Sequence, residues 1–444
     1  MPKRIVIVGG GFGGAAVAAR LEHLFRRDPD VELVLFDREN FSVFTPLLPE
    51  IPSGALEPKH IVSPLRARLR RTSVRQAEVR AIDVGRRVVV AGHCPMCAEY
   101  VVEYDYLVLA LGSVTNFFGL PGVAARARTM KSLADGADLH DLVIGKFEHA
   151  DLDPDPAARR QLLTFVVAGG GFAGVETAAE LNDFVRSAGR YYPRIGAEDV
   201  RVVLVHPGDR ILPEVSPSLS SYALKKLASR GVEVLLKTRI AGCDDDGVHL
   251  SNGDALPSHT LVWTAGVSAN PLLDELDLPR DAGGRVRVDT TLAVVERPGV
   301  FALGDCAAVR DGVTGKLYPP TAQYAIREGK TVADNVAAAI RGGAPRHFRY
   351  QPLGMLASLG RHSAVAEVLG LQFSGFFAWW LWRTIYLMKL PGFERKARVM
   401  IDWTLDLFFP RDIVYLRSMH AIPGSAATGI APDPHTDRVA VAAR

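Results

Sequence analysis

The sequence has few cysteines, almost no excess of charge of either sign, and no long apolar run free of charge. Its 444 residues contain 4 Cys, which argues against a disulfide framework. With 52 Lys and Arg against 49 Asp and Glu, the formal charge is +3, so we expect no nucleic-acid partner. The apolar start at residues 5–8 stops at glycine, and no charge-free apolar run reaches about 18 residues. We therefore expect neither a secretion signal nor a membrane span, and a protein that faces the cytosol.

The scarce cysteines offer little for thiol or metal chemistry. Cys94 and Cys97 stand in the segment HCPMC of residues 93–97, a spacing shared by zinc sites and redox pairs. A structural zinc site needs about four ligands, and the chain has no second cysteine pair, so we expect no resident metal. A turn between strands is the favoured interpretation, with a labile disulfide or an intersubunit metal site left open.

What the sequence does contain is a pair of nearly identical glycine-rich turns. The first is IVIVGGGFGG at residues 5–14, and the second is FVVAGGGFAG at residues 165–174. Each follows a short apolar run, fits G-x-G-x-x-G and leads into an alanine-rich helical pattern. The first glycine makes the tight turn, the second lets backbone N–H groups approach a pyrophosphate, and the third permits close helix–strand packing. Two such units predict two dinucleotide sites, one for a flavin and one for a nicotinamide.

Two carboxylates stand where a flavin dinucleotide needs them. Asp37 ends the strand predicted at residues 31–37, where a dinucleotide fold places the acid that accepts hydrogen bonds from ribose hydroxyls. Asp305 follows a second predicted strand, in the Gly-Asp turn of residues 304–305. Because the first glycine turn and these two acids supply different parts of one ligand's recognition, we expect FAD at the first unit.

The order of these features predicts an α/β fold. We expect two Rossmann-like dinucleotide-binding domains, the second inserted in the first, and a C-terminal membrane-associating region. The expected division is a first FAD-binding part at residues 1–118, a connection at 119–161, an NAD(P)-binding domain at 162–288, a second FAD-binding part at 289–340, a membrane-anchoring or dimerisation region at 341–420 and a flexible tail at 421–444.

Together these residues resemble the type II NADH:quinone dehydrogenases, which are respiratory flavoproteins that do not pump protons. The resemblance runs from Lys3 to Leu416. It rests on the two glycine turns and on the segments FTPLLP (44–49), RILP (210–213), WTAGV (263–267), FALGD (301–305), TAQ (321–323), LGRHSAVA (359–366) and SGFFAW (374–379). It implies FAD as the cofactor, NADH as the donor with NADPH left open, and a membrane quinone as the acceptor.

The resemblance also assigns residues to the expected sites. The flavin set is Gly9, Gly11, Phe12, Gly13, Gly14, Asp37, Arg38, Val79, Gly112, Gly304, Asp305 and Gln323. The nicotinamide set is Gly169, Gly171, Phe172, Gly174, Val175, His206 and Gly266. The catalytic set, near the meeting point of nicotinamide, flavin and quinone, is Glu176, Gln323 and Arg327. The alternative for Glu176 is a carboxylate that is simply favoured by the dipole of its helix.

Two positions depart from the family pattern. His206 stands where the family usually carries a Glu that binds ribose hydroxyls, and with Arg210 nearby a 2′-phosphate becomes acceptable. The choice between NADH and NADPH therefore stays open. Arg327 stands where the family often has a second Gln. Its guanidinium can donate to a quinone carbonyl or stabilise reduced anionic flavin, and the alternative is a solvated helix residue.

The C-terminal region is dense in aromatic residues, with four Trp between residues 379 and 403. Arg383 and Lys389 interrupt its apolar segment, and a basic side chain at bilayer mid-depth costs about 2.5–3.5 kcal/mol. We therefore expect a peripheral, monotopic protein on the cytoplasmic side of the cell membrane. We also expect a homodimer, which could use part of the same surface. The rival functions are a reductase of a ferredoxin-like protein and a redox-sensing flavin-binding protein.

Overall fold

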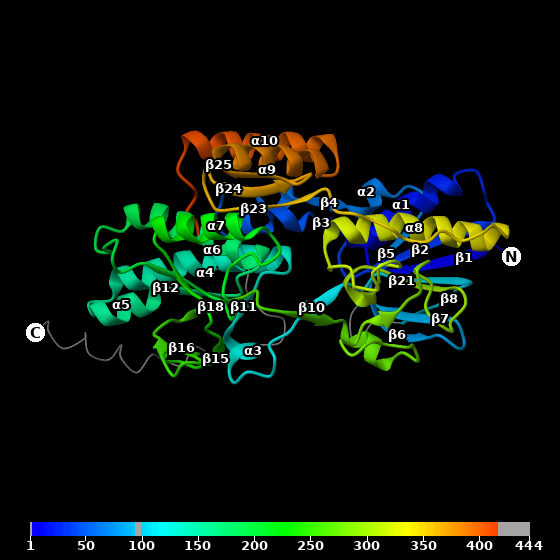
Figure 1. Cartoon of the computed structure of the whole chain (residues 1–444), viewed down its shortest axis with the longest axis horizontal. Coiled ribbons are helices and arrows are strands. Elements are labelled where there is room, and N and C mark those ends of the chain that lie inside the picture. Colours follow the sequence, from blue (N-terminus) through cyan, green and yellow to red (C-terminus); the bar gives the residue numbers. More distant parts are fainter. Residues whose placement is uncertain (1, 94–98, 416–444) are drawn as a thin grey trace, which may run out of the picture.

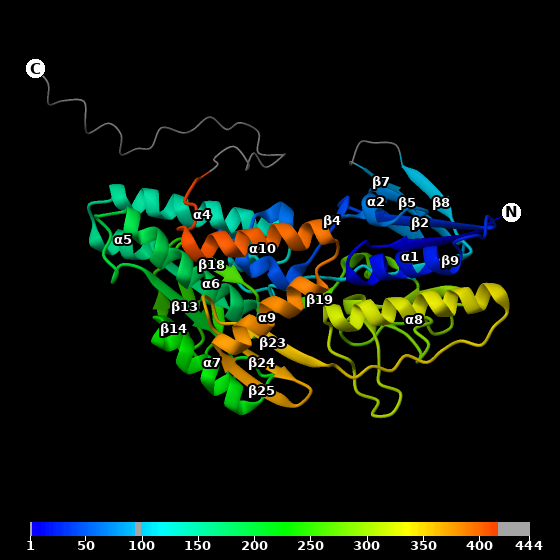
Figure 2. The same cartoon turned by 90° about the horizontal axis from the view of Figure 1, so that it is seen from above.

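The computed structural model describes residues 2–93 and 99–415, which form two α/β bodies lying side by side (Figure 1). The first body contains the N-terminal strands and helix α8 (Ala322–Arg341). The second contains the strands that follow residue 160. Helices α9 (Phe376–Lys389) and α10 (Phe393–Phe408) lie above the second body and reach toward the junction of the two, as Figures 1 and 2 both show.

Five parallel strands form the sheet of the first body, in the order β21-β9-β1-β2-β5. Their bounds are Lys3–Val8 (β1), Val31–Asp37 (β2), Ser73–Gln76 (β5), Tyr106–Leu109 (β9) and Val300–Ala302 (β21). Residues 5–8 of β1 are all apolar and buried, because both faces of the sheet are covered there. Helix α1 (Phe12–Leu24) packs against α8. Since β21 pairs with β9, the chain returns to this sheet after it has completed the second body.

A small antiparallel β-meander belongs to the first body. Strands β6 (Glu78–Asp83), β7 (Val88–Gly92) and β8 (Tyr100–Glu103) pair antiparallel in chain order. Their inward side chains Ile82, Val89 and Val102 are buried in the same core as the parallel sheet. Cys94 and Cys97 lie outside the described residues, as does the tail at 421–444.

The second body repeats the architecture of the first. Its parallel sheet has the order β11-β18-β12-β13-β14, with bounds Arg128–Thr129 (β11), Thr164–Ala168 (β12), Arg201–Val205 (β13), Val232–Leu235 (β14) and Thr260–Trp263 (β18). Helices α6 (Phe172–Ala188) and α7 (Pro217–Ser229) contribute to its core. The segment expected to be a connection holds α4 (Leu133–Leu152), which buries Leu139, Val143, Ile144 and Phe147 in that core.

A pair of short strands joins the two bodies. Strand β10 (Ser113–Thr115) pairs antiparallel with β19 (Val267–Ala269), so the chain crosses twice at one place (Figure 1). The indole N–H of Trp263 donates to the carbonyl of Asn116 at 2.8 Å, which ties the crossing to the second sheet. This crossing brings the carboxyl ends of both sheets, where ligands bind in such folds, toward the same junction.

The C-terminal region forms a small sheet under two helices. Strands β23 (Gly354–Ser358), β24 (Ala364–Val368) and β25 (Leu371–Gly375) pair antiparallel and lead into α9 and α10. Trp379, Trp382 and Trp403 pack in one core with the 3₁₀ helix η1 (Thr45–Glu50). In the described ranges, no helix combines the length and the apolar character needed to cross a membrane.

Arg383 interrupts the apolar sequence of α9, and the structure shows that its guanidinium points into the protein. It lies 4.1 Å from the ring centroid of Trp379 and 4.7 Å from that of Trp403, and 4.0 Å from a carboxylate oxygen of Asp406. Helical periodicity places Arg383 on the inward face of α9, so its charge is no obstacle to contact with a bilayer.

The shorter elements complete the fold. Their bounds are Phe41–Val43 (β3), Pro58–His60 (η2), Val62–Pro64 (β4), Leu65–Arg68 (α2), Val123–Arg126 (α3), Pro156–Leu162 (α5), Gly189–Tyr191 (η3), Ile240–Cys243 (β15), Val248–Leu250 (β16), Ala255–Leu256 (β17), Pro271–Glu275 (η4), Val286–Arg287 (β20), Gly304–Cys306 (η5) and Ala307–Ala308 (β22). The predicted α/β fold with two Rossmann-like units is confirmed.

Candidate functional site

The first glycine turn has the shape of a pyrophosphate cradle. Gly9 has a φ of 105°, and a Cβ there would overlap the carbonyl oxygen of Ala110. A Cβ at Gly14 would overlap the carbonyl of Gly9 in the same way. At Gly11, by contrast, a Cβ would meet nothing within 4 Å. Backbone N–H groups at the start of α1 therefore border open space, and a helix N-terminus attracts phosphate.

Asp37 lies at the edge of this cradle. Its carboxylate accepts hydrogen bonds from the backbone N–H groups of Gly10 and Glu39, the latter at 2.7 Å. Burial raises the pKa of Asp37, while these two hydrogen bonds and Arg38 act to lower it. The side chain is therefore fixed in direction, beside the turn that it is expected to serve. Arg38 itself is exposed and 4.0 Å from Glu78.

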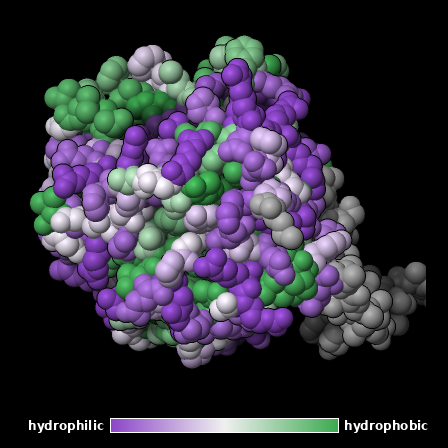
Figure 3. Space-filling model, turned by 90° about the vertical axis from the view of Figure 1, so that its right-hand side faces the viewer, coloured by the Kyte–Doolittle hydropathy of each residue, from purple (hydrophilic) through white to green (hydrophobic). Residues whose placement is uncertain are grey.

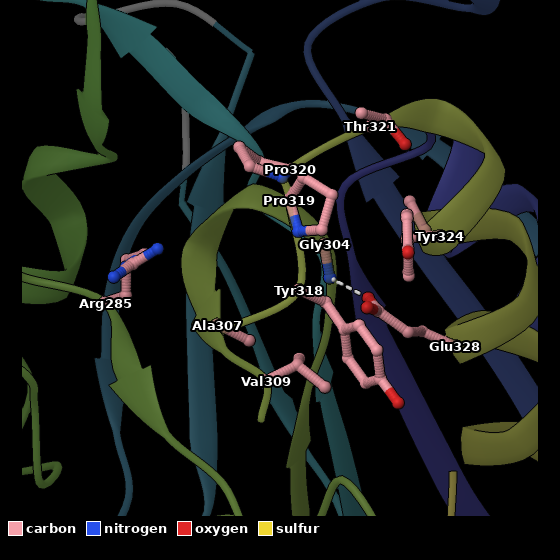
Figure 4. A pocket seen from close by; sticks show the side chains of 11 residues that line it. Arg285, Gly304, Ala307, Val309, Tyr318, Pro319, Pro320, Thr321, Tyr324 and Glu328 are labelled. Carbon is pink, nitrogen blue, oxygen red and sulfur yellow. Dashed lines mark hydrogen bonds between the residues drawn. The ribbon is translucent and has the colours of Figure 1, made fainter. Parts of the chain in front are cut away.

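Asp305 lies at the other end of the expected flavin site. Its Oδ2 accepts from the hydroxyl of Ser113 at 2.6 Å, and the ammonium of Lys131 donates to the same hydroxyl at 2.6 Å. Gly304 has a φ of 69°, and its N–H donates to Glu328 at 2.7 Å (Figure 4). Burial raises the pKa of Glu328 to about 7. The Gly-Asp turn is thus held from two sides, by β10 and by α8.

The remaining residues of the predicted flavin set either pack against the interior of the first body or border open space. Gly13 is required by packing, since a Cβ there would lie 2.7 Å from Leu303. Phe12 begins α1 and meets the ring of Phe44 edge-on at 6.0 Å. Gly112 has a φ of 65° with open space at its Cβ position, whereas Val79 on β6 packs against the first core. The open cradle at Gly11 and the fixed acids fit FAD.

The second glycine turn repeats the geometry. Gly169 has a φ of 112° and would collide with Thr264, and Gly174 would overlap the carbonyl of Gly169. At Gly171 a Cβ would meet only a carboxylate oxygen of Glu214, at 3.9 Å. This turn also borders open space at a helix N-terminus, that of α6. The other members of the predicted set lie around it, with Phe172 partly buried at the start of α6, Val175 in the second core and Gly266 under the ring of Phe118.

His206 takes the place of Asp37 in the second unit. Its Nδ1 accepts from the N–H of Gly170 at 3.0 Å, as Asp37 accepts from Gly10, so the proton of the neutral ring is on Nε2. The other side of the ring bonds to the carbonyl of Arg210. Burial lowers the pKa of His206, while the carboxylates of Glu214 and Asp209 act to raise it. Both ring nitrogens are thus bonded to other groups of the protein. The guanidinium of Arg210 donates to the carbonyls of Pro213 and Val215.

Glu176 is buried where α6 meets the C-terminal region. One carboxylate oxygen accepts from the N–H of Ser358 at 2.9 Å and from the indole of Trp382 at 3.3 Å. Burial raises the pKa of Glu176 to about 8, and nearby Glu50 and Glu180 act in the same direction. The carboxyl is therefore neutral near pH 7, which a simple helix-dipole role does not require. No contact joins it to Gln323 or Arg327 within the described part of the chain.

Gln323 and Arg327 lie together on the first turns of α8. Arg327 donates to the main-chain carbonyl of Gln323 at 3.1 Å and stacks on the ring of Tyr350, with its Cζ 4.1 Å from the centroid. The hydroxyl of Tyr350 donates to the carboxamide oxygen of Gln323 at 3.0 Å. Lys389, at the end of α9, lies close enough to Arg327 for their charges to repel. Trp382, about two turns before Lys389 in α9, donates to Glu176, so the second half of this helix links the surroundings of Glu176 to those of Arg327.

Four residues of these sites were missed by the reasoning from sequence. They are Ser113, Lys131, Glu328 and Tyr350. Each forms a hydrogen bond to another residue of its site or to a neighbouring backbone group. None of the four is part of a glycine turn or of another recognisable sequence motif. Ser113 directly follows the apolar segment YLVLALG of residues 106–112, which is the one local signal that could have pointed to it.

Comparison with known proteins agrees with this geometry. Residues 3–329 match the model of the pyridine nucleotide-disulphide oxidoreductases, and residues 353–412 match that of the NDH2 C-terminal domain. The chain is 33% identical over 426 residues to the type II NADH:quinone oxidoreductase Ndh of Mycobacterium tuberculosis, covering 92% of this chain and 89% of that protein. The chain belongs to the type II NADH:quinone oxidoreductase family.

Two further known proteins are also similar to this chain over most of its length. The demethylphylloquinone reductase NdbB of Synechocystis is 32% identical, covering 90% of this chain and 95% of that protein. A solved structure of NDH2 from Plasmodium falciparum in complex with NADH superimposes with a TM-score of 0.85 at 20% identity, over 93% of this chain and all of that one. Membership of the family confirms the predicted enzyme class and the predicted cofactors FAD and NADH. The roles of individual residues remain predictions.

Proposed function

We propose that this chain oxidises NADH and reduces a quinone dissolved in the membrane, without moving protons across it. The observation that supports this most is the pair of glycine turns, each with open space at its second glycine before a helix N-terminus. When bound, FAD accepts hydride from the nicotinamide and passes two electrons to the quinone. The protein's part is orientation and electrostatics, so it needs no side-chain nucleophile.

The flavin would lie along the edge of the first sheet. The start of α1 would hold its pyrophosphate at Gly11, and Asp37 would accept hydrogen bonds from the adenosine ribose. Asp305 would bind the ribityl chain. Its orientation is fixed in advance by Ser113, and that of its turn by Glu328, so little conformational entropy would be lost on binding.

The nicotinamide would bind at the second glycine turn, with NADH preferred over NADPH. Glu214 and Asp209 both act electrostatically on His206, and Glu214 faces the open space at Gly171. Two carboxylates near the adenosine end would repel a 2′-phosphate, and Arg210 is already bonded to its own loop. His206 would stabilise the turn, and Glu214 would supply the acidic contact to the ribose.

The enzyme would attach to the cytoplasmic leaflet through α9 and α10, because its donor NADH is a cytosolic molecule. Hydrophobic side chains gather along the upper edge of Figure 3, where these helices lie in Figure 1. The exposed members are Phe376, Phe377, Trp380, Met388, Phe393, Met400, Ile401, Leu405, Leu407, Phe408 and Phe409. We name this set the apolar face. Exposed apolar side chains gathered on two neighbouring helices suit a lipid surface, and a homodimer would compete for part of it.

The decisive test uses the purified flavoprotein with NADH and a short-chain quinone. We expect anaerobic NADH to bleach the flavin and the added quinone to restore its colour. Initial rates at several fixed quinone concentrations should give parallel double-reciprocal lines, as expected for a two-stage transfer. NADPH should give a lower kcat/KM. Bleaching without reoxidation by any quinone would favour a ferredoxin-like acceptor, and absence of bleaching would favour a redox sensor.

A further inference from the structure

The carboxamide of Gln323 has only one orientation compatible with its neighbours. Its nitrogen lies 3.5 Å from the carbonyl oxygen of Gly354, and its oxygen lies 3.0 Å from the hydroxyl of Tyr350. A carbonyl can only accept a hydrogen bond, so the amide nitrogen must face Gly354. The amide oxygen then faces Tyr350, whose hydroxyl must donate. The long contact to Gly354 uses at most one amide hydrogen, and the second is left for a ligand.

The ring of Tyr350 also positions a second side chain, that of Arg327. The guanidinium of Arg327 stacks on it at 4.1 Å, while one N–H of Arg327 donates to the main-chain carbonyl of Gln323. A guanidinium has five N–H donors, so most remain for a ligand. Tyr350 is itself held edge-on by the buried ring of Tyr324, at a centroid distance of 5.0 Å. One aromatic side chain therefore sets the positions of two donor groups.

The consequence is a site in which hydrogen-bond donors outnumber acceptors. The amide oxygen of Gln323 already accepts one hydrogen bond from Tyr350, and Arg327 has no acceptor atom. We propose that Tyr350 is a positioning residue that aims the donors of Gln323 and Arg327 at the carbonyl oxygens of the quinone. This inference rests on the proposed quinone reduction. A ligand whose polar atoms are carbonyl oxygens matches this surplus of donors.

The test compares Tyr350→Phe and Tyr350→Leu in the full-length holoenzyme, with ubiquinone-1 as the probe. Tyr350→Phe keeps the ring under Arg327 but frees the Gln323 amide to rotate. We expect the KM for ubiquinone-1, and its Kd measured without NADH, to rise roughly 3- to 10-fold, the effect of one lost hydrogen bond. Tyr350→Leu also removes the stacking partner of Arg327 and should raise both constants further. The rate of flavin bleaching by NADH, measured on the same samples, should change less than the quinone KM in both variants.

A double-mutant cycle separates positioning from a general structural role. In a Gln323→Leu background there is no amide to orient, so Tyr350→Phe should change the quinone KM by less than about 2-fold. Tyr100→Phe, on exposed strand β8, is the matched control and should behave like the wild type. Equal effects of Tyr350→Phe in both backgrounds, or an unchanged KM and Kd, would overturn the role of Tyr350 alone. A wild-type protein whose NADH-reduced flavin is reoxidised neither by ubiquinone-1 nor by a short-chain naphthoquinone would overturn the proposed function as well.

Discussion

The two glycine turns differ at one residue that ends the second strand of each unit. Asp37 and His206 both accept a hydrogen bond from the N–H of the middle glycine, so the turn needs an acceptor there but not a charge. Asp37 keeps a carboxylate that can reach a ribose. His206 uses its second ring nitrogen on the carbonyl of Arg210 instead. We therefore expect the two units to hold an adenosine ribose in different ways.

Asp305→Ala should release FAD. The variant removes a carboxylate already oriented by Ser113, and a hydrogen bond to a charged group contributes about 1.5–3 kcal/mol. We expect FAD affinity to fall roughly 10-fold or more. The flavin-to-protein ratio after gel filtration measures this, and Asp311→Ala, a partly exposed acid in the following loop, is the control. Full flavin retention in Asp305→Ala would remove Asp305 from the site.

His206→Glu should increase the preference for NADH over NADPH. One carboxylate oxygen can accept from Gly170 as the imidazole does, and the other becomes available to a ribose hydroxyl. The added negative charge would also repel a 2′-phosphate. The ratio of the two kcat/KM values reports the change, with His149→Glu on the exposed side of α4 as control. The hypothesis fails if the ratio is the same in all three proteins.

At the scale of elements, α9 and α10 bury polar groups and expose apolar ones. Trp403 donates to Glu50 at 2.6 Å, and Asp406 receives the guanidinium of Arg411 at 3.0 Å, both in the interior. Outside lies the apolar face. This inversion is costly in water, since exposed aromatic and aliphatic side chains lose the hydrophobic stabilisation that burial would give them. It is explained when a lipid surface covers the outer side.

Met400→Glu with Phe408→Glu should weaken membrane attachment without unfolding the protein. Both side chains are more than half exposed, so the charges would face solvent in the free protein and headgroups in the bound one. Cosedimentation with anionic liposomes should fall, while flavin content and bleaching by NADH stay unchanged. Leu152→Glu, equally exposed on α4, should cosediment like the wild type. Truncation after Tyr350 is a poorer probe, because it also removes Trp382 and Trp403 from the interior.

At the scale of the whole molecule, a buried cluster of charged side chains joins the C-terminal region to both bodies. Arg411 bridges Glu180 on α6 at 3.2 Å and Asp406 on α10 at 3.0 Å. Glu50 comes from η1, and burial raises its pKa to about 7, with Glu180 acting in the same direction and Arg383 against it. Because these carboxyls come from segments far apart in sequence, their protonation is a property of the folded protein.

The buried carboxyl of Glu176, whose pKa is raised in part by Glu50 and Glu180 of this cluster, makes the free energy of unfolding depend on pH. Glu176 has a folded-state pKa of about 8 against an ordinary value of 4.5, so between these values the native state holds a proton that the unfolded state has released. The free energy of unfolding therefore falls as pH rises through this range. Glu176→Gln keeps a neutral acceptor for Ser358 and should remove that contribution. We expect the variant to melt at a higher temperature than the wild type at pH 8, and at a similar temperature at pH 5.

The exposed Glu57 provides the comparison for that experiment. Glu57→Gln should leave the pH dependence of melting unchanged, because the removed carboxyl is in water in both states. If the melting temperatures of wild type and Glu176→Gln change in parallel between pH 5 and pH 8, Glu176 is ionised in the native protein. Its burial would then have to be compensated by a cation.

The sequence by itself determined the two dinucleotide turns, the strands that enter them, and Asp37 and Asp305. These depend on local geometry, because only glycine fits beside Ala110 and Thr264, and because a buried parallel strand must be apolar on both faces. Only the tertiary structure decided which way Arg383 points, which atoms His206 bonds, and that Tyr350 orients Gln323. Glu176 and Trp382 are 206 positions apart. Contacts of that separation depend on how the packed elements meet, which no local pattern of residues encodes.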